Sequence, residues 1–98
     1  MAKYLLLWQL DPAGIPTDPK ERAKAWEPFA QAIKGDMEKG ITKDWGSFLG
    51  ELNGYAVVEG TEMEIDQMTE QYTPFVTFKT HAVLSLEQNA KLIKAMSK

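Results

Sequence analysis

Residues 45–60 constrain this chain more than any other stretch, because they have the pattern of a β-hairpin that is apolar on both faces. Asn53-Gly54 favours a two-residue type I′ turn, since both residue types tolerate positive φ. Such a turn would set the pairing of the flanking strands: Leu52 with Tyr55, Gly50 with Val57 and Phe48 with Glu59.

Neighbouring side chains of a strand point to opposite faces, so the two faces of this hairpin can be compared. Tyr55 and Val57 would share one face, while Leu49 and Val58 would lie on the other. A hairpin that is apolar on both faces needs a covering layer on each side.

The rest of the chain predicts an order βαββαβ followed by a further helix. Residues 3–10 are a continuous apolar run typical of a central strand, and residues 75–83 are rich in β-branched and aromatic residues. Three helices are expected from their N-terminal signals: Asp18-Pro19, the capping box Thr61–Glu64 and the capping box Ser85–Gln88. Pro28 interrupts the first helix but not the phase of its apolar stripe, which favours a kink over a break.

This order predicts a single α+β domain over residues 1–98 with the ferredoxin-like arrangement. Its sheet would be antiparallel, in the strand order 4-1-3-2, with both crossover helices on one face. The last helix would turn Leu86, Ala90, Ile93 and Met96 inward.

Two crossover helices can cover only one face of a four-stranded sheet, yet residues 3–10 are apolar on both sides. One source of a second layer is the sheet of a partner subunit, because a two-fold contact matches like with like. The alternative is that the C-terminal helix folds under the sheet. The two-layer argument favours the homodimer, arranged as a dimeric α/β barrel.

Composition excludes several functions. The 98 residues contain no cysteine, which removes disulfides, thiolate metal sites and cysteine nucleophiles. The net charge is −3, so the chain lacks the excess of basic residues that is typical of a nucleic-acid-binding protein. No stretch has the length of a membrane span, and the N-terminal apolar run is too short for a signal peptide. We therefore expect a cytoplasmic protein with no membrane or nucleic-acid partner.

Three segments carry a resemblance to a known superfamily: Tyr4-Leu-Leu-Leu-Trp8, Gly54-Tyr-Ala-Val-Val-Glu-Gly60 and Phe75-Val-Thr-Phe-Lys-Thr-His-Ala-Val-Leu84. The chain resembles the dimeric α+β barrel superfamily, within a branch of short single-domain bacterial and archaeal proteins without assigned function. The resemblance implies a homodimer whose two sheets face each other, with a pocket between each sheet and its own helices. Known activities in the superfamily include quinol-type monooxygenases, a lactone isomerase and haem-degrading proteins, so it supports a fold far more than a function.

His81 and Glu59 are the candidate catalytic residues. His81 is the only histidine and could act as a general base or a haem ligand; the alternative is a solvated or interface histidine. As far as the resemblance goes, haem-degrading relatives place their ligand histidine elsewhere, which weakens the haem interpretation. Glu59 ends the third strand and could act as a base if buried; the alternative is an exposed strand end.

Aromatic residues are the candidate ligand contacts. Trp8, Tyr55 and Phe78 could line a pocket for a flat ligand, against the alternative that they belong to the core or the dimer interface. Trp8 would lie beside the proline-rich loop 11–18, which could serve as a lid. The acidic residues between positions 59 and 66 match no calcium-loop spacing, so no metal site is predicted.

Two hypotheses of function result. In the first, a homodimeric barrel binds a small apolar or aromatic metabolite, and an enzymatic version transforms it without a metal. In the second, the protein is a non-catalytic ligand-sensing or structural dimer. No cofactor is predicted, although haem and flavin stay open. A catalyst should bury Glu59 or His81 in a pocket of roughly 300 Å³ or more.

Overall fold

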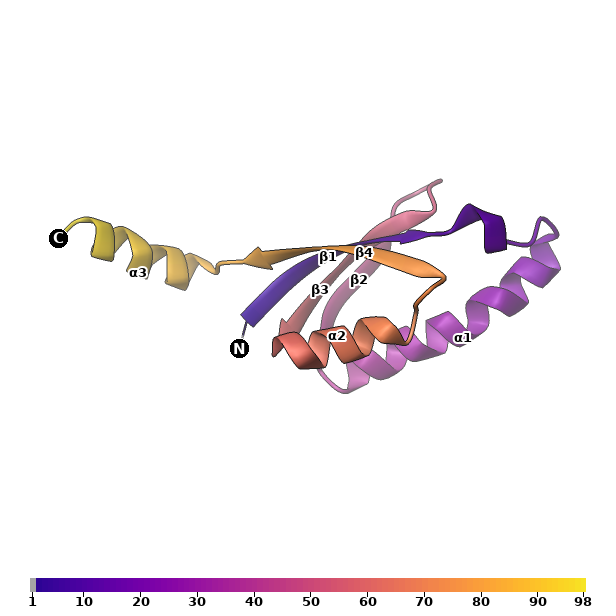
Figure 1. Ribbon diagram of the computed structural model, residues 1–98, viewed down its shortest axis with the longest axis horizontal. Helices are drawn as coiled ribbons and strands as arrows, with labels where there is room; N and C mark the ends of the chain where they lie inside the picture. The colour runs from indigo at the N-terminus through magenta and orange to yellow at the C-terminus, as the bar shows by residue number, and fades with distance from the viewer. Residues whose placement is uncertain (1) are drawn as a thin grey trace.

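The computed structural model describes residues 2–98 and shows an antiparallel sheet with two helices on one face and a third helix that projects away (Figure 1). The architecture is α+β, and its element order is the predicted one. The elements in chain order are β1 (Ala2–Leu10), a short 3-10 turn (Pro12–Gly14), α1 (Pro19–Glu38), β2 (Thr42–Ser47), β3 (Asn53–Gly60), α2 (Glu62–Glu70), β4 (Val76–Val83) and α3 (Leu86–Met96).

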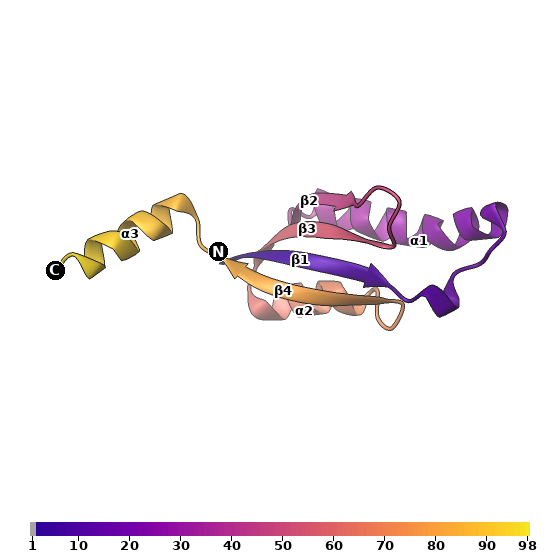
Figure 2. The same ribbon diagram turned by 90° about the horizontal axis from the view of Figure 1, so that it is seen from above.

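The four strands lie in the order β2-β3-β1-β4, which reads 4-1-3-2 from the β4 edge (Figure 2). Every neighbouring pair is antiparallel, and β1 lies between β3 and β4, with Leu6 opposite Ala56 on one side and Thr80 on the other. The arrangement is compatible with a ferredoxin-like fold. The continuous apolar run of β1 is explained by this central position.

The predicted helix signals are confirmed. The Asp18 carboxylate accepts a hydrogen bond from the backbone N–H of Glu21, and α1 runs on through Pro28 without ending. Both predicted capping boxes are formed, at Thr61–Glu64 and at Ser85–Gln88. Among the described residues, no helix combines the length and apolar character needed to cross a bilayer.

The hairpin is present, but the predicted turn at Asn53-Gly54 is wrong. Both residues belong to β3, and the connection is the longer loop 48–52, closed by a 2.9 Å hydrogen bond from the backbone N–H of Phe48 to the carbonyl oxygen of Asn53. Within this loop the positive φ falls on Gly50, at 76°. Gly54 has a different role, because a Cβ there would collide with the carbonyl oxygen of Gly46 and with the Trp8 indole.

The strand pairings deduced from that turn are therefore also wrong: Gly46 lies opposite Tyr55, and Ser47 lies opposite Gly54. The predicted division of β3 into two faces nevertheless holds. Val58 is buried toward the helices, whereas Val57 is only partly buried on the other side. The face of a side chain depends on its position along its own strand, and the turn does not change that alternation.

The hydrophobic core lies between the sheet and the two crossover helices. Leu6 and Val58, from the two central strands, are both 0% exposed. The other buried apolar residues also come from the helix face of the sheet and from the α2 segment: Trp8, Leu10, Ala56, Ile65, Met68, Tyr72 and Val76. We refer to this side of the sheet as the helix face.

The opposite side, the open face, has no covering layer among residues 2–98. Leu5, Leu7 and Val57 form its centre and are partly exposed. The chain's α3 does not fold under the sheet but extends beyond β4 (Figure 1), and the molecule is 61 Å long as a result. Leu86, Ile93 and Met96 are 88%, 64% and 75% exposed, so the prediction that they turn inward is wrong for the single chain.

Candidate functional site

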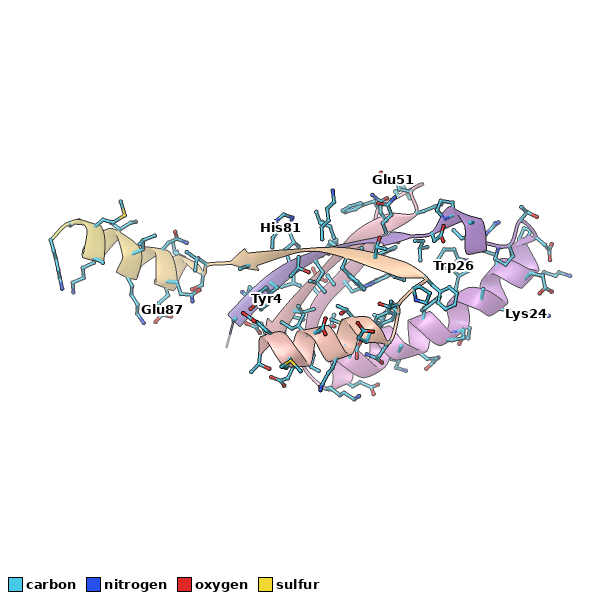
Figure 3. All side chains as sticks on the ribbon, in the orientation of Figure 1. Tyr4, Lys24, Trp26, Glu51, His81 and Glu87 are labelled. Carbon is cyan, nitrogen blue, oxygen red and sulfur yellow. The ribbon has the colours of Figure 1, made fainter. Side chains whose placement is uncertain are left out.

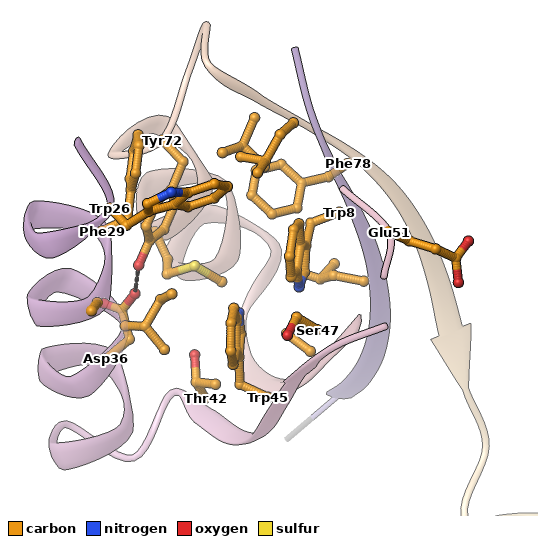
Figure 4. Close-up of a pocket in the computed structure, with 17 residues that line it drawn as sticks. Trp8, Trp26, Phe29, Asp36, Thr42, Trp45, Ser47, Glu51, Tyr72 and Phe78 are labelled. Carbon is orange, nitrogen blue, oxygen red and sulfur yellow. Dashed lines mark hydrogen bonds between the residues drawn. The ribbon is translucent and has the colours of Figure 1, made fainter. Parts of the chain in front are cut away.

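A cavity of about 280 Å³ lies between the helix face of the sheet and the helices α1 and α2 (Figure 4). Aromatic side chains from four elements dominate its wall, and a few polar groups interrupt them. The lining residues are Leu6, Trp8, Leu10, Trp26, Phe29, Ala30, Ile33, Asp36, Thr42, Trp45, Ser47, Glu51, Ala56, Met68, Tyr72, Val76 and Phe78.

Two indoles form the sheet side of the cavity. Trp8 of β1 and Trp45 of β2 stack with ring centroids 5.3 Å apart and an angle of 6° between their planes. They meet across β3 because the residues opposite them in the sheet, Gly54 and Ala56, are small. The indole N–H of Trp8 donates a 3.2 Å hydrogen bond to the carbonyl oxygen of Tyr55, which fixes the ring.

The helices and β4 supply the remaining rings. Phe29 comes from α1, Tyr72 follows the end of α2 and Phe78 lies on β4. The Tyr72 ring contacts both of the others, at centroid distances of 6.1 Å to Phe29 and 6.2 Å to Phe78. Rigid rings from three elements thus hold the wall in one shape.

Asp36 is the buried charged group of the cavity, only 2% exposed. The Tyr72 hydroxyl donates a 2.6 Å hydrogen bond to Asp36 Oδ2, and the Gln71 amide donates a 3.1 Å bond to Oδ1. Burial, and then the bond to Asp36, raise the pKa of the Tyr72 phenol well above its usual value. Tyr72 is therefore a neutral donor throughout the physiological range, and the network joins α1 to the end of α2.

The charges that line the cavity are all negative. Its carboxylates are those of Asp36 and Glu51, and its lining in the described part of the chain includes no lysine, arginine or histidine. Glu51 is exposed, and its carboxylate points away from the ring cluster (Figure 4). The interior of the cavity is therefore aromatic, with one carboxylate.

Two of the three predicted ligand contacts line this cavity, namely Trp8 and Phe78. Tyr55 lies on the open face, where its hydroxyl donates a 2.8 Å hydrogen bond to Asp44 and its ring stacks on Phe48. The bond to Asp44 raises the pKa of the Tyr55 phenol. The sequence pattern grouped these aromatic residues, and the strand alternation divides them between two faces.

The two candidate catalytic residues also lie on the open face. His81 is exposed on β4, opposite Leu5, and points away from the helices (Figure 3). Glu59 of β3 forms a 3.6 Å ion pair with Lys43. The fold thus places both side chains on the same side of the sheet, separated by β1 and turned away from the aromatic cavity.

Sequence reasoning missed Asp36, although a signal for it was present. Phe29, Ile33 and Asp36 follow one another at helical spacing, so the carboxylate occupies a core position of an amphipathic helix. The neighbouring apolar residue Met37 would continue the same stripe, but it is 45% exposed. A charged residue at an inward helical position needs a partner, and that partner, Tyr72, comes from a distant segment.

A second hollow, of about 390 Å³, adjoins the first and is bounded by the loop 11–18. Ile15 and Pro16 of that loop lie across from Phe75, and Trp26 and Phe29 line both spaces. Trp26 and Phe29 therefore lie between the loop and the aromatic cavity. That the loop serves as a lid remains a prediction.

In the described residues, no group of three or more acidic or histidine side chains is arranged to hold a metal ion. Comparison with protein-family models and with curated proteins finds no match to this chain.

Proposed function

We propose that this protein is a cytoplasmic homodimer of the dimeric α+β barrel type that binds a small apolar or aromatic metabolite in the cavity between its sheet and helices. The observation that carries the proposal is the 280 Å³ cavity, with its stacked Trp8–Trp45 pair and its further aromatic rings. Its volume is close to the lower end of known ligand pockets, about 300–1,000 Å³.

An open, ring-lined cavity favours ligand binding over a purely structural role. Protein interiors are packed as densely as organic crystals, and a space lined by apolar groups loses contacts unless something fills it. A structural dimer would gain stability from a larger side chain at Ala30, which lines this cavity. The resemblance to the superfamily points to the same location, between the sheet and its own helices.

The proposal is for binding rather than for catalysis by the residues first considered. His81 and Glu59 point away from the cavity, so neither can act on a ligand inside it in this arrangement. In the proposed dimer these two side chains would lie between the two sheets. The ligand-sensing version of the function needs no metal or cofactor.

The uncovered apolar surfaces support the dimer. The centre of the open face is apolar, and α3 exposes its own apolar stripe instead of covering that face. A second copy can bury both, because a two-fold axis brings identical faces together. Multi-angle light scattering at tens of micromolar should give twice the 11.0 kDa mass of the chain, and a monomer at that concentration would contradict the dimer.

Charge distribution suggests where α3 packs. Residues 86–98 contain three lysines and one glutamate and carry a net charge of +2, whereas the rest of the chain carries −5. A basic, amphipathic arm that leaves an acidic body is suited to pack against the body of a second copy. We therefore place α3 on the partner subunit in the proposed dimer.

Ligand binding is tested by a thermal-shift and tryptophan-fluorescence screen with quinones, flavins, haem, aromatic acids and aromatic amines. A ligand at 100 times its Kd should stabilise the protein by about 2.7 kcal/mol. Uniformly unchanged melting temperatures would contradict a binding function.

A pair of matched variants locates the binding site. Ala30→Leu places a larger side chain at the cavity wall and should weaken binding, whereas Ala23→Leu makes the same change elsewhere on α1, outside both hollows. Equal ligand affinity in the two variants would place the binding site outside the cavity.

A further inference from the structure

Asp36 has only neutral partners. Its carboxylate is 2% exposed and accepts hydrogen bonds from the Tyr72 hydroxyl and the Gln71 amide. The ion pairs in the described residues are Lys24–Glu21 and Lys43–Glu59, and neither includes it. The buried carboxylate of the cavity therefore has no cation of its own within the described chain.

A carboxylate without a cation is costly in an apolar interior. Removing a charge from water is unfavourable unless a charge of opposite sign or a full set of hydrogen bonds replaces the lost solvation. An ionised carboxylate has about four acceptor positions, and the three hydrogen bonds that Tyr72 and Gln71 donate leave about one of them free. Asp36 can therefore accept another hydrogen bond, and a charged donor would be the most stabilising.

The surroundings of Asp36 suit an organic cation. Figure 4 shows its carboxylate on the α1 side of the cavity, with Trp45 and the other rings around the same space. The faces of aromatic rings attract cations through their quadrupole, and tryptophan does so most strongly. A ligand with one ammonium group and a hydrocarbon body would match the carboxylate and the rings together.

We infer that the cavity selects a small organic amine in its protonated form, with the ammonium group at Asp36 and the hydrocarbon part among the aromatic rings. This inference rests on the proposed ligand-binding function and adds the ligand's chemical class. Anionic ligands are rejected because the lining supplies no cation to meet them. Neutral aromatic ligands bind more weakly because they leave Asp36 without its counter-charge.

Three probes of similar size and different charge test the inference on the full chain: 2-phenylethylamine, 2-phenylethanol and phenylacetate. At pH 7 the first is a cation, the second is neutral and the third is an anion. Titration followed by the fluorescence of the cavity tryptophans should show the amine binding at least about tenfold more tightly than the alcohol, a difference of about 1.4 kcal/mol. Phenylacetate should bind most weakly of the three.

Two variants separate the charge from the hydrogen bond. Asp36→Asn keeps the size of the side chain and an acceptor for Tyr72 but removes the charge, so it should abolish the preference and bring the affinities for the amine and the alcohol to within about twofold of each other. Tyr72→Phe removes the neutral donor and keeps the carboxylate, so the preference should persist. Circular dichroism checks that each variant is folded.

The outcomes separate this inference from the proposed function. If the alcohol binds as tightly as the amine to the unaltered protein, the cavity is a ligand site but the amine selectivity is refuted. A preference that survives in Asp36→Asn also refutes it, because Asp36 is then not its source. If none of the three probes binds and the thermal-shift and fluorescence screen also finds no ligand, both proposals fail. The comparison of the three probes needs no variant, so a poorly folded Asp36→Asn does not remove the test.

Discussion

The two faces of the sheet differ in this molecule, because one is covered and the other is not. The helix face is covered by α1 and α2, buries Leu6 and Val58 completely, and encloses an aromatic cavity. The open face carries Leu5, Val57 and Tyr55 from the same strands, yet none of the described elements covers it. Both faces are apolar because successive residues of β1 and β3 are apolar and point to opposite sides, but only connectivity determines which face receives the crossover helices.

This difference assigns different roles to neighbouring residues. A substitution on the helix face should change the free energy of unfolding of each subunit. The matching substitution on the open face, one residue away, should change self-association instead.

Leu6→Ala should lower the free energy of unfolding by about 3–5 kcal/mol, because a fully buried leucine loses its contacts and leaves a cavity. Leu5→Ala, on the open face, should cost clearly less in dilute solution, where its side chain is partly exposed. Urea denaturation followed by circular dichroism measures both. Equal losses would show that the two faces are equally well packed within one subunit.

Val57→Asp should weaken self-association by at least about a hundredfold, or about 2.7 kcal/mol, because it buries an unpaired charge between the two sheets. The monomer should stay folded, since Val57 lies outside the core. Sedimentation velocity over a range of concentrations gives the dissociation constant. Gln67→Asp, at an exposed position of α2 on the other side of the sheet, is the control and should leave the dissociation constant unchanged. An unchanged dimer in Val57→Asp would contradict the two-sheet interface.

Gly54→Ala should cost about 2–3 kcal/mol of stability, because the added Cβ collides with the Gly46 carbonyl oxygen and the stacked Trp8 ring. Gly46→Ala, on the open face, should cost less, because the nearest atoms to the added Cβ, from 2.6 Å, belong to the Tyr55 ring, and this side chain can move toward solvent. Thermal unfolding of the two variants provides the comparison. A larger loss for Gly46→Ala would show that the Tyr55 ring is held as firmly as the Trp8 ring.

Raising the pH should affect the stability contributions of Tyr72 and Tyr55 differently. Burial and the Asp36 bond raise the pKa of the Tyr72 phenol in the folded protein above its ordinary value of about 10. The contribution of Tyr72 to the free energy of unfolding is therefore fully present below pH 10 and is lost as the pH rises above 10. Tyr72→Phe should reduce this loss of stability at alkaline pH, whereas Tyr55→Phe should change it little, because Tyr55 lies on the open face. Chemical denaturation at pH 8 and at pH 11 tests the pair.

Helix capping and the alternation of side chains along a strand are local signals, and both gave correct predictions. The capping residues Asp18, Thr61 and Ser85 each act within one helical turn, so their helices could be located without knowledge of the fold. The residues of β1 and β3 could be sorted into two faces in the same way, because successive side chains of a strand point to opposite sides whatever the rest of the fold is. The existence of the hairpin followed from two apolar segments that are close in sequence.

The errors concern contacts between distant segments. Gly54 was predicted to be a turn residue, but its lack of a side chain leaves room for the Trp8 indole, which is 46 positions away in the chain. Asp36 was not singled out in the sequence, because its partner, Tyr72, is 36 positions away. Leu86 and Ile93 were expected to be core residues, but they are exposed, and no described segment of the chain covers α3.

The amino-acid sequence by itself determined the order of the elements, their caps and the two apolar faces of the sheet, because propensity, capping and alternation act over a few residues. Only the tertiary structure decided the hairpin register, the face on which each candidate residue lies and the position of Asp36 in an aromatic cavity. These features depend on which distant side chains pack together in the limited space between the sheet and the helices. That packing is determined only when the whole chain is folded.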